Sequence, residues 1–285
     1  MSNQGGAATT KNLIFSGDTL NSLPKDVHLC DIESDGLSGW PAEKTIGVVA
    51  GYGAKDVIET LLRHNLHHVI QYDSNARTFT QEAELTGQII HNPQLFFEKP
   101  LECIFGGSSK ESYSLKFNSY IEKAPALDEL ANFLRLVPRT TTVATPALTI
   151  ADELFTNALL NAPGQRRAST QEEMRKFKSS KTSEIFLGTD YSKLVIGCRD
   201  LYGTLDIQRL LHRLQETFTL GIGKSIRHDP TTGAGIGFRV ILEMSKSLYV
   251  GVRKGKETLI CCELPLRQSM KETEGAPKNI HLVTL

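Results

Sequence analysis

The stretch Asp152–Ala162, DELFTNALLNA, is the part of this 285-residue chain from which the fold can be predicted outward. Its leucines recur at helical spacing and neither Gly nor Pro interrupts them, so a helix is predicted. Glu153 and Asn157 lie four residues apart on one face, which Asn161 extends by a turn. An amide oxygen can ligate Mg²⁺ and a carboxylate can orient or deprotonate a nucleophile. This face therefore suits a nucleotide–metal site, although the same pairing is common on solvated helices.

The segment Val195–Asp206, VIGCRDLYGTLD, begins with an apolar run that predicts a strand. Asp200 follows the run, and Gly203 lies in the turn after it. A buried aspartate at a strand end can accept a hydrogen bond from an exocyclic amine and reject a base that lacks this donor. The turn is therefore a candidate site for recognising adenine.

The segment Thr231–Leu266 contains three alternating glycines, Gly233, Gly235 and Gly237, directly before an apolar-periodic run. Glycines let backbone N–H groups approach phosphate oxygens, and the N-terminus of a following helix adds free donors and a favourable dipole. A predicted strand pair follows, and its second strand carries Thr258 and ends in Leu-Pro. Such glycine triplets also occur in ordinary turns, so the order of all these segments is the stronger signal.

In this order the segments resemble the GHKL superfamily, which includes gyrase and the histidine kinases, over about Leu148–Leu266. The resemblance is strongest to histidine-kinase catalytic domains and anti-sigma-factor serine kinases. It implies a Bergerat-type mixed sheet with helices on one face and ATP between a helix and a lid. The family's D-x-G-x-G box departs here to DLYGT, so Leu201 or Tyr202 could intrude into the adenine pocket.

The resemblance also implies roles in a site for ATP and Mg²⁺. Asn157 is expected to ligate the metal, and Glu153 to act as the base or to position water. Asp200 is expected to accept a hydrogen bond from the adenine amino group, with Thr258 near the base. The remaining residues are expected to contact the nucleotide: Gly203, Gly233, Gly235, Gly237, Asn161 and Lys224. Lys224 lies where the family carries its lid, and such residues are common in lids without a role.

Residues 11–105 alternate between strand and helix patterns, which predicts a small parallel α/β domain. The predicted strands cover 11–18, 27–32, 46–50 and 68–72, and the predicted helices cover 56–65 and 78–91. The order resembles a response-regulator receiver but lacks its acidic pair, Ser/Thr and Lys, so it is expected to be an unphosphorylated receiver relative or an unrelated docking domain. Asp31, Glu33 and Asp35 could form a metal site, with a solvated acidic loop as the alternative.

The rest of the chain is expected to connect and extend these two α/β domains. The predicted organisation is a disordered segment 1–10, the receiver-like domain 11–105, a linker with a helix 106–140, the GHKL-type domain 141–266 and a tail 267–285. The tail is polar except for an apolar patch at His281–Leu285 that could dock on a partner. His64, His67 and His68 are expected to have a capping or surface role.

Composition excludes several classes of protein. Lys and Arg number 32, as do Asp and Glu, so the formal net charge is zero, which argues against a dedicated binder of nucleic acid. Five cysteines form no paired framework and are expected to pack in a reducing compartment. No run of 18 apolar residues occurs, so membrane insertion is not expected, and a cytoplasmic protein is predicted.

Two functions remain open from the sequence. The first is a bacterial signalling regulator that binds ATP and Mg²⁺ and, if active, works as a serine or histidine kinase-like transferase on another signalling protein. The second is a non-catalytic pseudokinase that uses its two domains to bind proteins. The helix predicted before Asp152 has no His, so autophosphorylation there is not expected, and this helix is a spacer or a homodimer contact.

Overall fold

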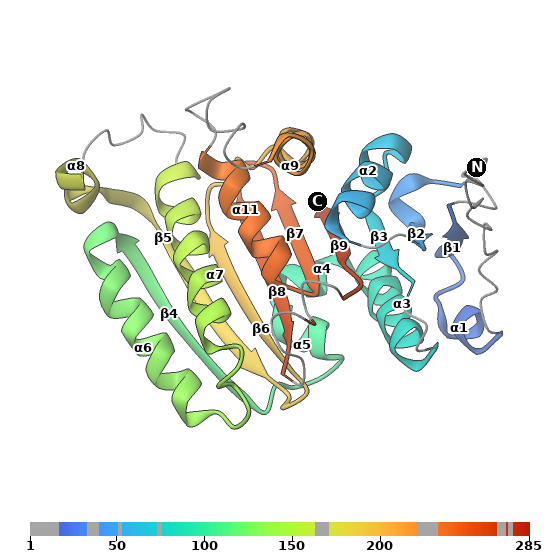
Figure 1. Ribbon diagram of the computed structural model, residues 1–285, viewed down its shortest axis with the longest axis horizontal. Helices are drawn as coiled ribbons and strands as arrows, with labels where there is room; N and C mark the ends of the chain where they lie inside the picture. Colours follow the sequence, from blue (N-terminus) through green and yellow to red (C-terminus); the bar gives the residue numbers. More distant parts are fainter. Residues whose placement is uncertain are drawn as a thin grey trace, which may run out of the picture.

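The computed structural model describes residues 17–32, 40–50, 53–72, 76–162, 171–221, 233–266, 272 and 276–285. In these residues the strands form one nine-stranded mixed sheet in the order β1-β2-β3-β9-β7-β8-β6-β5-β4 (Figure 1). The strands are β1 His28–Asp31, β2 Thr45–Val49, β3 His68–Gln71, β4 Glu111–Ser119, β5 Lys178–Thr189, β6 Lys193–Asp200, β7 Ser247–Arg253, β8 Glu257–Pro265 and β9 Asn279–Thr284.

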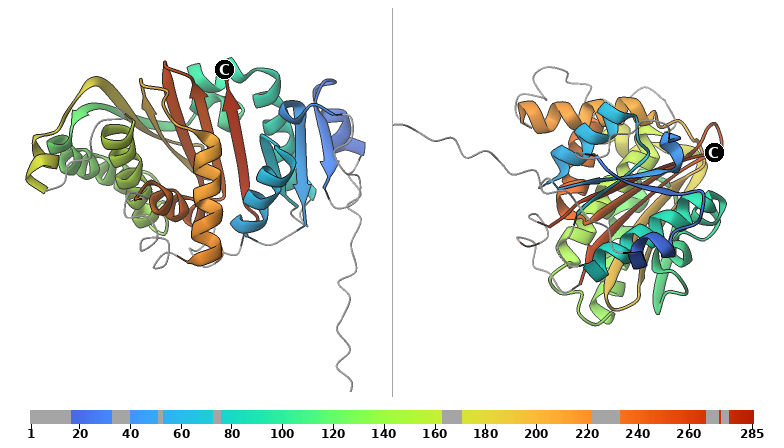
Figure 2. Two further views of the ribbon diagram at one scale, coloured as in Figure 1. Left: turned by 90° about the horizontal axis from the view of Figure 1, so that it is seen from above. Right: turned by 90° about the vertical axis from the view of Figure 1, so that its right-hand side faces the viewer.

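Helices lie on both sides of this sheet (Figure 2). The α-helices are α1 Gly17–Ser22, α2 Ala54–His64, α3 Ala76–His91, α4 Pro93–Glu98, α5 Pro100–Phe105, α6 Lys123–Leu136, α7 Ala144–Thr156, α8 Gln171–Lys176, α9 Ile207–Leu220 and α11 Gly233–Met244. A π-helical turn, η3, continues α7 over Asn157–Asn161, and short 3₁₀ turns cover Ala42–Lys44 (η1) and Tyr120–Glu122 (η2). The predicted α/β class is confirmed.

The front strands β1, β2 and β3 are parallel neighbours, as the alternating pattern predicts. Every residue of β2 is buried, which is typical of a parallel strand covered on both faces. Helix α2 presents Val57, Ile58 and Leu61 to the core and ends at His64. The next residue, Asn65, caps the helix in a left-handed conformation with φ 51°. The strand expected over 11–18 is wrong at its end, because Gly17 begins α1; residues 11–16 lie outside the described ranges.

The last strand, β9, lies in the middle of the sheet, antiparallel to β3 and parallel to β7 (Figure 1). It therefore joins the two expected domains into one sheet. Before it, Lys278 donates to the carbonyls of Glu243 (3.0 Å) and Ser245 (2.7 Å) at the end of α11, a favourable place for a buried cation. The docking tail predicted at the C-terminus is thus wrong, because these residues pair within the chain.

The rear strands β7, β8, β6, β5 and β4 are antiparallel, with α6, α7 and α11 side by side on one face (Figure 1). Phe155 of α7 stacks on Phe117 of β4 with ring centroids 3.8 Å apart. The opposite face is covered by α4 and α5. Phe96 and Phe97 of α4 pack against Tyr249 and neighbouring strand residues. Helices therefore cover both faces of the rear strands, not the one face expected.

His68 differs from its predicted surface role. It lies in β3 with an exposed fraction of 3%, whereas His64 is in the last turn of α2 as expected. His68 is the first residue of β3, and all four residues of this strand are buried, whereas His67 precedes the strand. A strand covered on both faces buries consecutive side chains, so His68 lies in the interior.

Candidate functional site

Helix α7 carries the first residues of the candidate site. Its apolar side chains Ile150, Leu154 and Phe155 are almost fully buried against the sheet. Glu153 points in a different direction around the helix from Leu154 and Phe155. Its side chain therefore lies on the side of α7 away from the sheet and is half-buried. The predicted polar face is therefore present at this part of the helix.

The next turn, η3, is π-helical, a form that often marks functional sites. Asn161 Nδ2 donates to Asn157 Oδ1 over 2.6 Å, so the two predicted site asparagines contact each other. Asn157 Nδ2 is buried and has no hydrogen-bond partner in the described residues. An orphaned buried amide of this kind calls for a structural reason, and an absent ligand is one.

The Glu153 carboxyl group lies in a desolvated environment. Burial raises its pKa, the neighbouring Asp152 raises it further, and Lys123 opposes both. Lys123 Nζ lies 2.7 Å from Asp152 Oδ1 and donates to Thr156 Oγ1 over 2.8 Å, so it joins α6 to α7 beside Glu153. A carboxylate with a raised pKa is a better proton acceptor near neutral pH.

Gly237 of α11 directly faces Glu153. A methyl group added at Gly237 would lie 2.1 Å from Glu153 Oε2, so only glycine leaves the carboxylate its present position. Gly233 and Gly235, expected in a turn before the helix, are in the first turn of α11 instead. Lys224 lies outside the described residues.

Helix α11 is held in place by Arg239, which sequence reasoning missed. Its guanidinium group lies 4.6 Å from the Phe218 ring centroid and donates to the carbonyl of Thr217, both on α9. Its Nε also pairs with Glu243 Oε1 at 2.8 Å. The middle of α11 is thus fixed against α9.

Asp200 lies buried at the end of β6, as predicted. Its Oδ1 accepts hydrogen bonds from the backbone N–H groups of Tyr202 (2.8 Å) and Gly203 (3.3 Å). Burial raises the pKa of Asp200, and these bonds oppose the shift. Thr258 of β8 is the residue paired with Asp200 in the sheet. The Thr258 hydroxyl is buried and makes no hydrogen bond of normal geometry in the described residues.

The turn after Asp200 connects the strand to the end of the helix. Gly203 has φ +62°, and a Cβ there would lie 2.2 Å from the Arg253 carbonyl oxygen, so glycine is required. Thr204 Oγ1 donates to the Ala162 carbonyl over 2.6 Å. This bond brings the Asp200 turn to the last residue of the DELFTNALLNA stretch; because it spans 42 residues of sequence, no local pattern could reveal it.

Tyr202, which was expected to be able to enter the adenine pocket, has its hydroxyl group at the start of β5. The hydroxyl lies 2.7 Å from Ser179 Oγ and 3.1 Å from Ser180 Oγ. Lys181 Nζ lies 4.9 Å from the tyrosine ring centroid and donates to the Leu201 carbonyl over 2.7 Å. These contacts hold the turn in one conformation.

No model of a known protein family matches this chain, and no curated protein is similar to it. Across the described ranges, no helix is both long and apolar enough to cross a bilayer. In the same ranges, no three His, Cys, Asp or Glu side chains are grouped to hold a metal ion. Of the acidic trio weighed as a metal site, Glu33 and Asp35 lie outside the described residues.

Proposed function

We propose that this chain is a cytoplasmic signalling protein that binds ATP between α7 and α11 and acts on another signalling protein. The observation that carries the proposal is the meeting of three segments at one helix. Glu153 faces Gly237, and Ala162 accepts a hydrogen bond from Thr204 of the Asp200 turn. Residues proposed for phosphate, metal and adenine thus surround α7 and η3.

The polar atoms of this region fit a nucleotide. Asn157 Nδ2 and Thr258 Oγ1 are buried and lack normal hydrogen bonds within the described residues. A buried polar group left without a partner costs about 1–3 kcal/mol, so a ligand that satisfies either group is favoured. The Asp200 carboxylate beside Thr258 can accept a hydrogen bond from an adenine amine.

The donor set also fits Mg²⁺ bound together with a phosphate chain. Mg²⁺ is usually held by one or two protein oxygens, phosphate oxygens and water, and Asn157 Oδ1 would supply the protein oxygen. When bound, the ion would neutralise charge on the phosphates. Glu153 would position and deprotonate a hydroxyl group of the partner, helped by its raised pKa.

A second function, a non-catalytic nucleotide-responsive regulator, has its own supporting observation. Asn157 Oδ1 already accepts a hydrogen bond from Asn161. Metal ligation would have to compete with that bond, which favours binding without phosphoryl transfer. The same site would then serve as a switch for protein binding.

Titration calorimetry with ATP and a non-hydrolysable analogue, with and without Mg²⁺, tests the proposal. We expect micromolar binding that requires Mg²⁺ and is lost in Asn157→Ala, because the metal ligand is removed. Asn132→Ala is the matched control, since Asn132 is exposed on α6. Absence of binding at millimolar ATP in the wild type would overturn the proposal.

A phosphoryl-transfer assay separates the two functions. Incubation with radiolabelled ATP and candidate partner proteins should label the partner in the wild type and not in Glu153→Gln if the chain is a kinase. Binding of ATP without labelling or hydrolysis would instead support the regulator.

A further inference from the structure

Three buried aromatic side chains form a row across the place where the front strands meet the rear strands. His68 of β3 pairs with His281 of β9, and Tyr249 of β7 pairs with His281 from the other side. The ring centroids lie 5.7 Å apart for the two histidines and 4.8 Å apart for Tyr249 and His281. We call this row the seam; its exposed fractions are 3%, 0% and 0%.

The imidazoles of the seam have almost no polar partners. His68 Nδ1 and both ring nitrogens of His281 are buried without a hydrogen bond in the described residues. A neutral imidazole has one donor and one acceptor, whereas a protonated imidazole has two donors and a full charge. Protonation inside the closed seam would therefore add an unpaired buried charge, which is strongly unfavourable.

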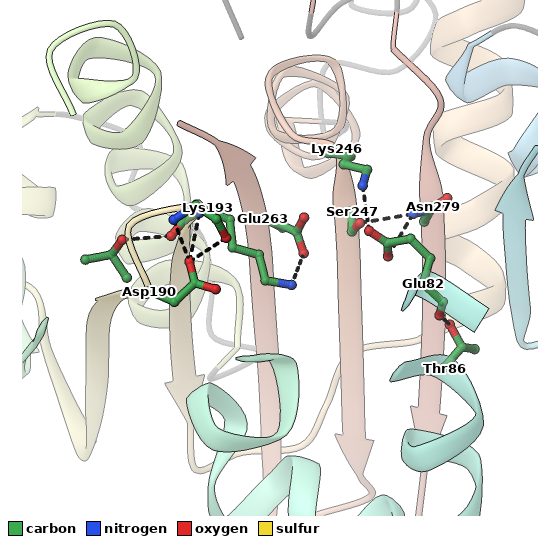
Figure 3. A network of polar contacts seen from close by, with 10 residues as sticks. Glu82, Thr86, Asp190, Lys193, Lys246, Ser247, Glu263 and Asn279 are labelled. Atoms are coloured by element: carbon green, nitrogen blue, oxygen red, sulfur yellow. Dashed lines mark hydrogen bonds and ion pairs between the residues drawn. The ribbon is translucent and has the colours of Figure 1, made fainter. Parts of the chain in front are cut away.

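A network of buried polar contacts fastens α3 beside the seam (Figure 3). Glu82 of α3 accepts from Lys246 Nζ over 2.6 Å and from Asn279 Nδ2 over 3.2 Å. Asn279 also donates to Ser247 Oγ over 3.2 Å. The network joins the front helix α3 to β7 and β9 at the level of the seam.

Charged and titratable groups surround the row from every element packed against it. Glu263 of β8 favours a charge on His281, but burial outweighs it and lowers the pKa of His281 to about 3. Burial also lowers the pKa of His68, and the neighbouring His281 and His67 lower it further. The other groups around the row are Glu82, Lys246, Lys193, Cys261, Cys103 and the Tyr249 hydroxyl.

We propose that the seam is an acid-operated latch, in which neutral His68 and His281 keep β3 and β9 closed under α3 and their protonation opens this part of the sheet. The opened state exposes both imidazoles to water, where each can take up a proton. Mild acid thereby separates the front strands from the rear strands before the rear strands themselves unfold.

The sign and size of the effect follow from linkage. The pKa of each histidine is lower in the closed state than the ordinary value of about 6.5, so the open state binds more protons below that pH. Between pH 7.5 and 5, each imidazole should raise the opening constant about thirtyfold. Above pH 7 the histidines should make no pH-dependent contribution.

Hydrogen exchange measured by mass spectrometry at pH 7.5 and 5.0, corrected for intrinsic exchange rates, tests the latch. Peptides covering β3 and β9 should lose protection at pH 5.0 in the wild type. In the double variant His68→Gln/His281→Gln the loss should be about a thousandfold smaller, because two proton-binding groups are gone. His212→Gln on the exposed face of α9 is the matched control and should behave as the wild type.

Two results would overturn the proposal. One is an equal loss of protection in the wild type and the double variant. The other is a loss in β5, β6 and β8 as large as that in β3 and β9, which would mean global unfolding. If the double variant fails to fold, His281→Phe, which preserves the stack on Tyr249, replaces it in the same comparison.

Discussion

The candidate site and the seam are two polar clusters on opposite faces of one sheet, and they differ in access to solvent. Asn157 has an orphaned amide beside the half-buried Glu153, so a ligand arriving from solution can satisfy it. His281 has two orphaned nitrogens at zero exposure, so only opening of the structure can satisfy them. Unsatisfied polar atoms are therefore the basis of the proposed ligand site in the first place and of the proposed latch in the second.

The largest effect should come from removing the support of the candidate site. Phe155→Ala deletes a fully buried ring that stacks on Phe117, and such a change costs about 3–5 kcal/mol. We expect a corresponding fall in the free energy of urea-induced unfolding. Leu136→Ala, at an 84% exposed position on α6, should change stability by less than about 0.5 kcal/mol. A small change in Phe155→Ala would show that α7 is not anchored as described.

On the seam side, Glu82→Leu should destabilise the fold by about 3 kcal/mol, because it removes the carboxylate, buried on α3, that Lys246 Nζ contacts at 2.6 Å. The double variant Glu82→Leu/Lys246→Met should recover much of that loss, since neither charge remains. Thermal or urea unfolding of the three proteins measures the difference. If the double variant is no more stable than the single one, the pair does not fasten α3 to β7 and β9.

The histidine comparison has an intermediate effect that depends on pH. The folded pKa of His281 is depressed to about 3, so its contribution is fully present above pH 6.5 and is lost as the pH falls toward 3. At pH 5 the wild type should have lost about 2 kcal/mol through this residue. His281→Gln should lack this part of the pH dependence in urea denaturation at pH 7.5 and 5.0. An equal loss of unfolding free energy between pH 7.5 and 5.0 in the two proteins would contradict the prediction.

The smallest effect on stability should occur at the candidate site itself. Asn157→Ala removes an amide whose Nδ2 has no partner in the described residues, so unfolding free energy should change by less than about 1 kcal/mol in the absence of ligand. ATP should stabilise the wild type in thermal unfolding and leave the variant unchanged. A large loss of stability without ligand would mean that Asn157 is structural.

Much of the fold could be predicted from local patterns. The helical leucines of α7, the parallel order of β1, β2 and β3 and the α/β class all depend on short-range periodicity. Strands β4 and β5 were missed because polar residues occupy all but a few positions of β4, the edge strand, and the first half of β5, which pairs with it. The contacts that connect the predicted site segments, such as Thr204 with Ala162, could not be predicted. They join segments that are far apart in the sequence.

By itself, the sequence indicated the stretches that we propose as a site: the Glu153–Asn157 face, the aspartate at the end of β6 and the glycines of α11. It did so because helix and turn preferences are local. Only the tertiary structure decided that six residues near the C-terminus, β9, complete the sheet between β3 and β7 and bury His281 against His68. Strand pairing satisfies backbone groups from distant segments, so the same short sequence is a tail or a central strand according to the neighbours it finds.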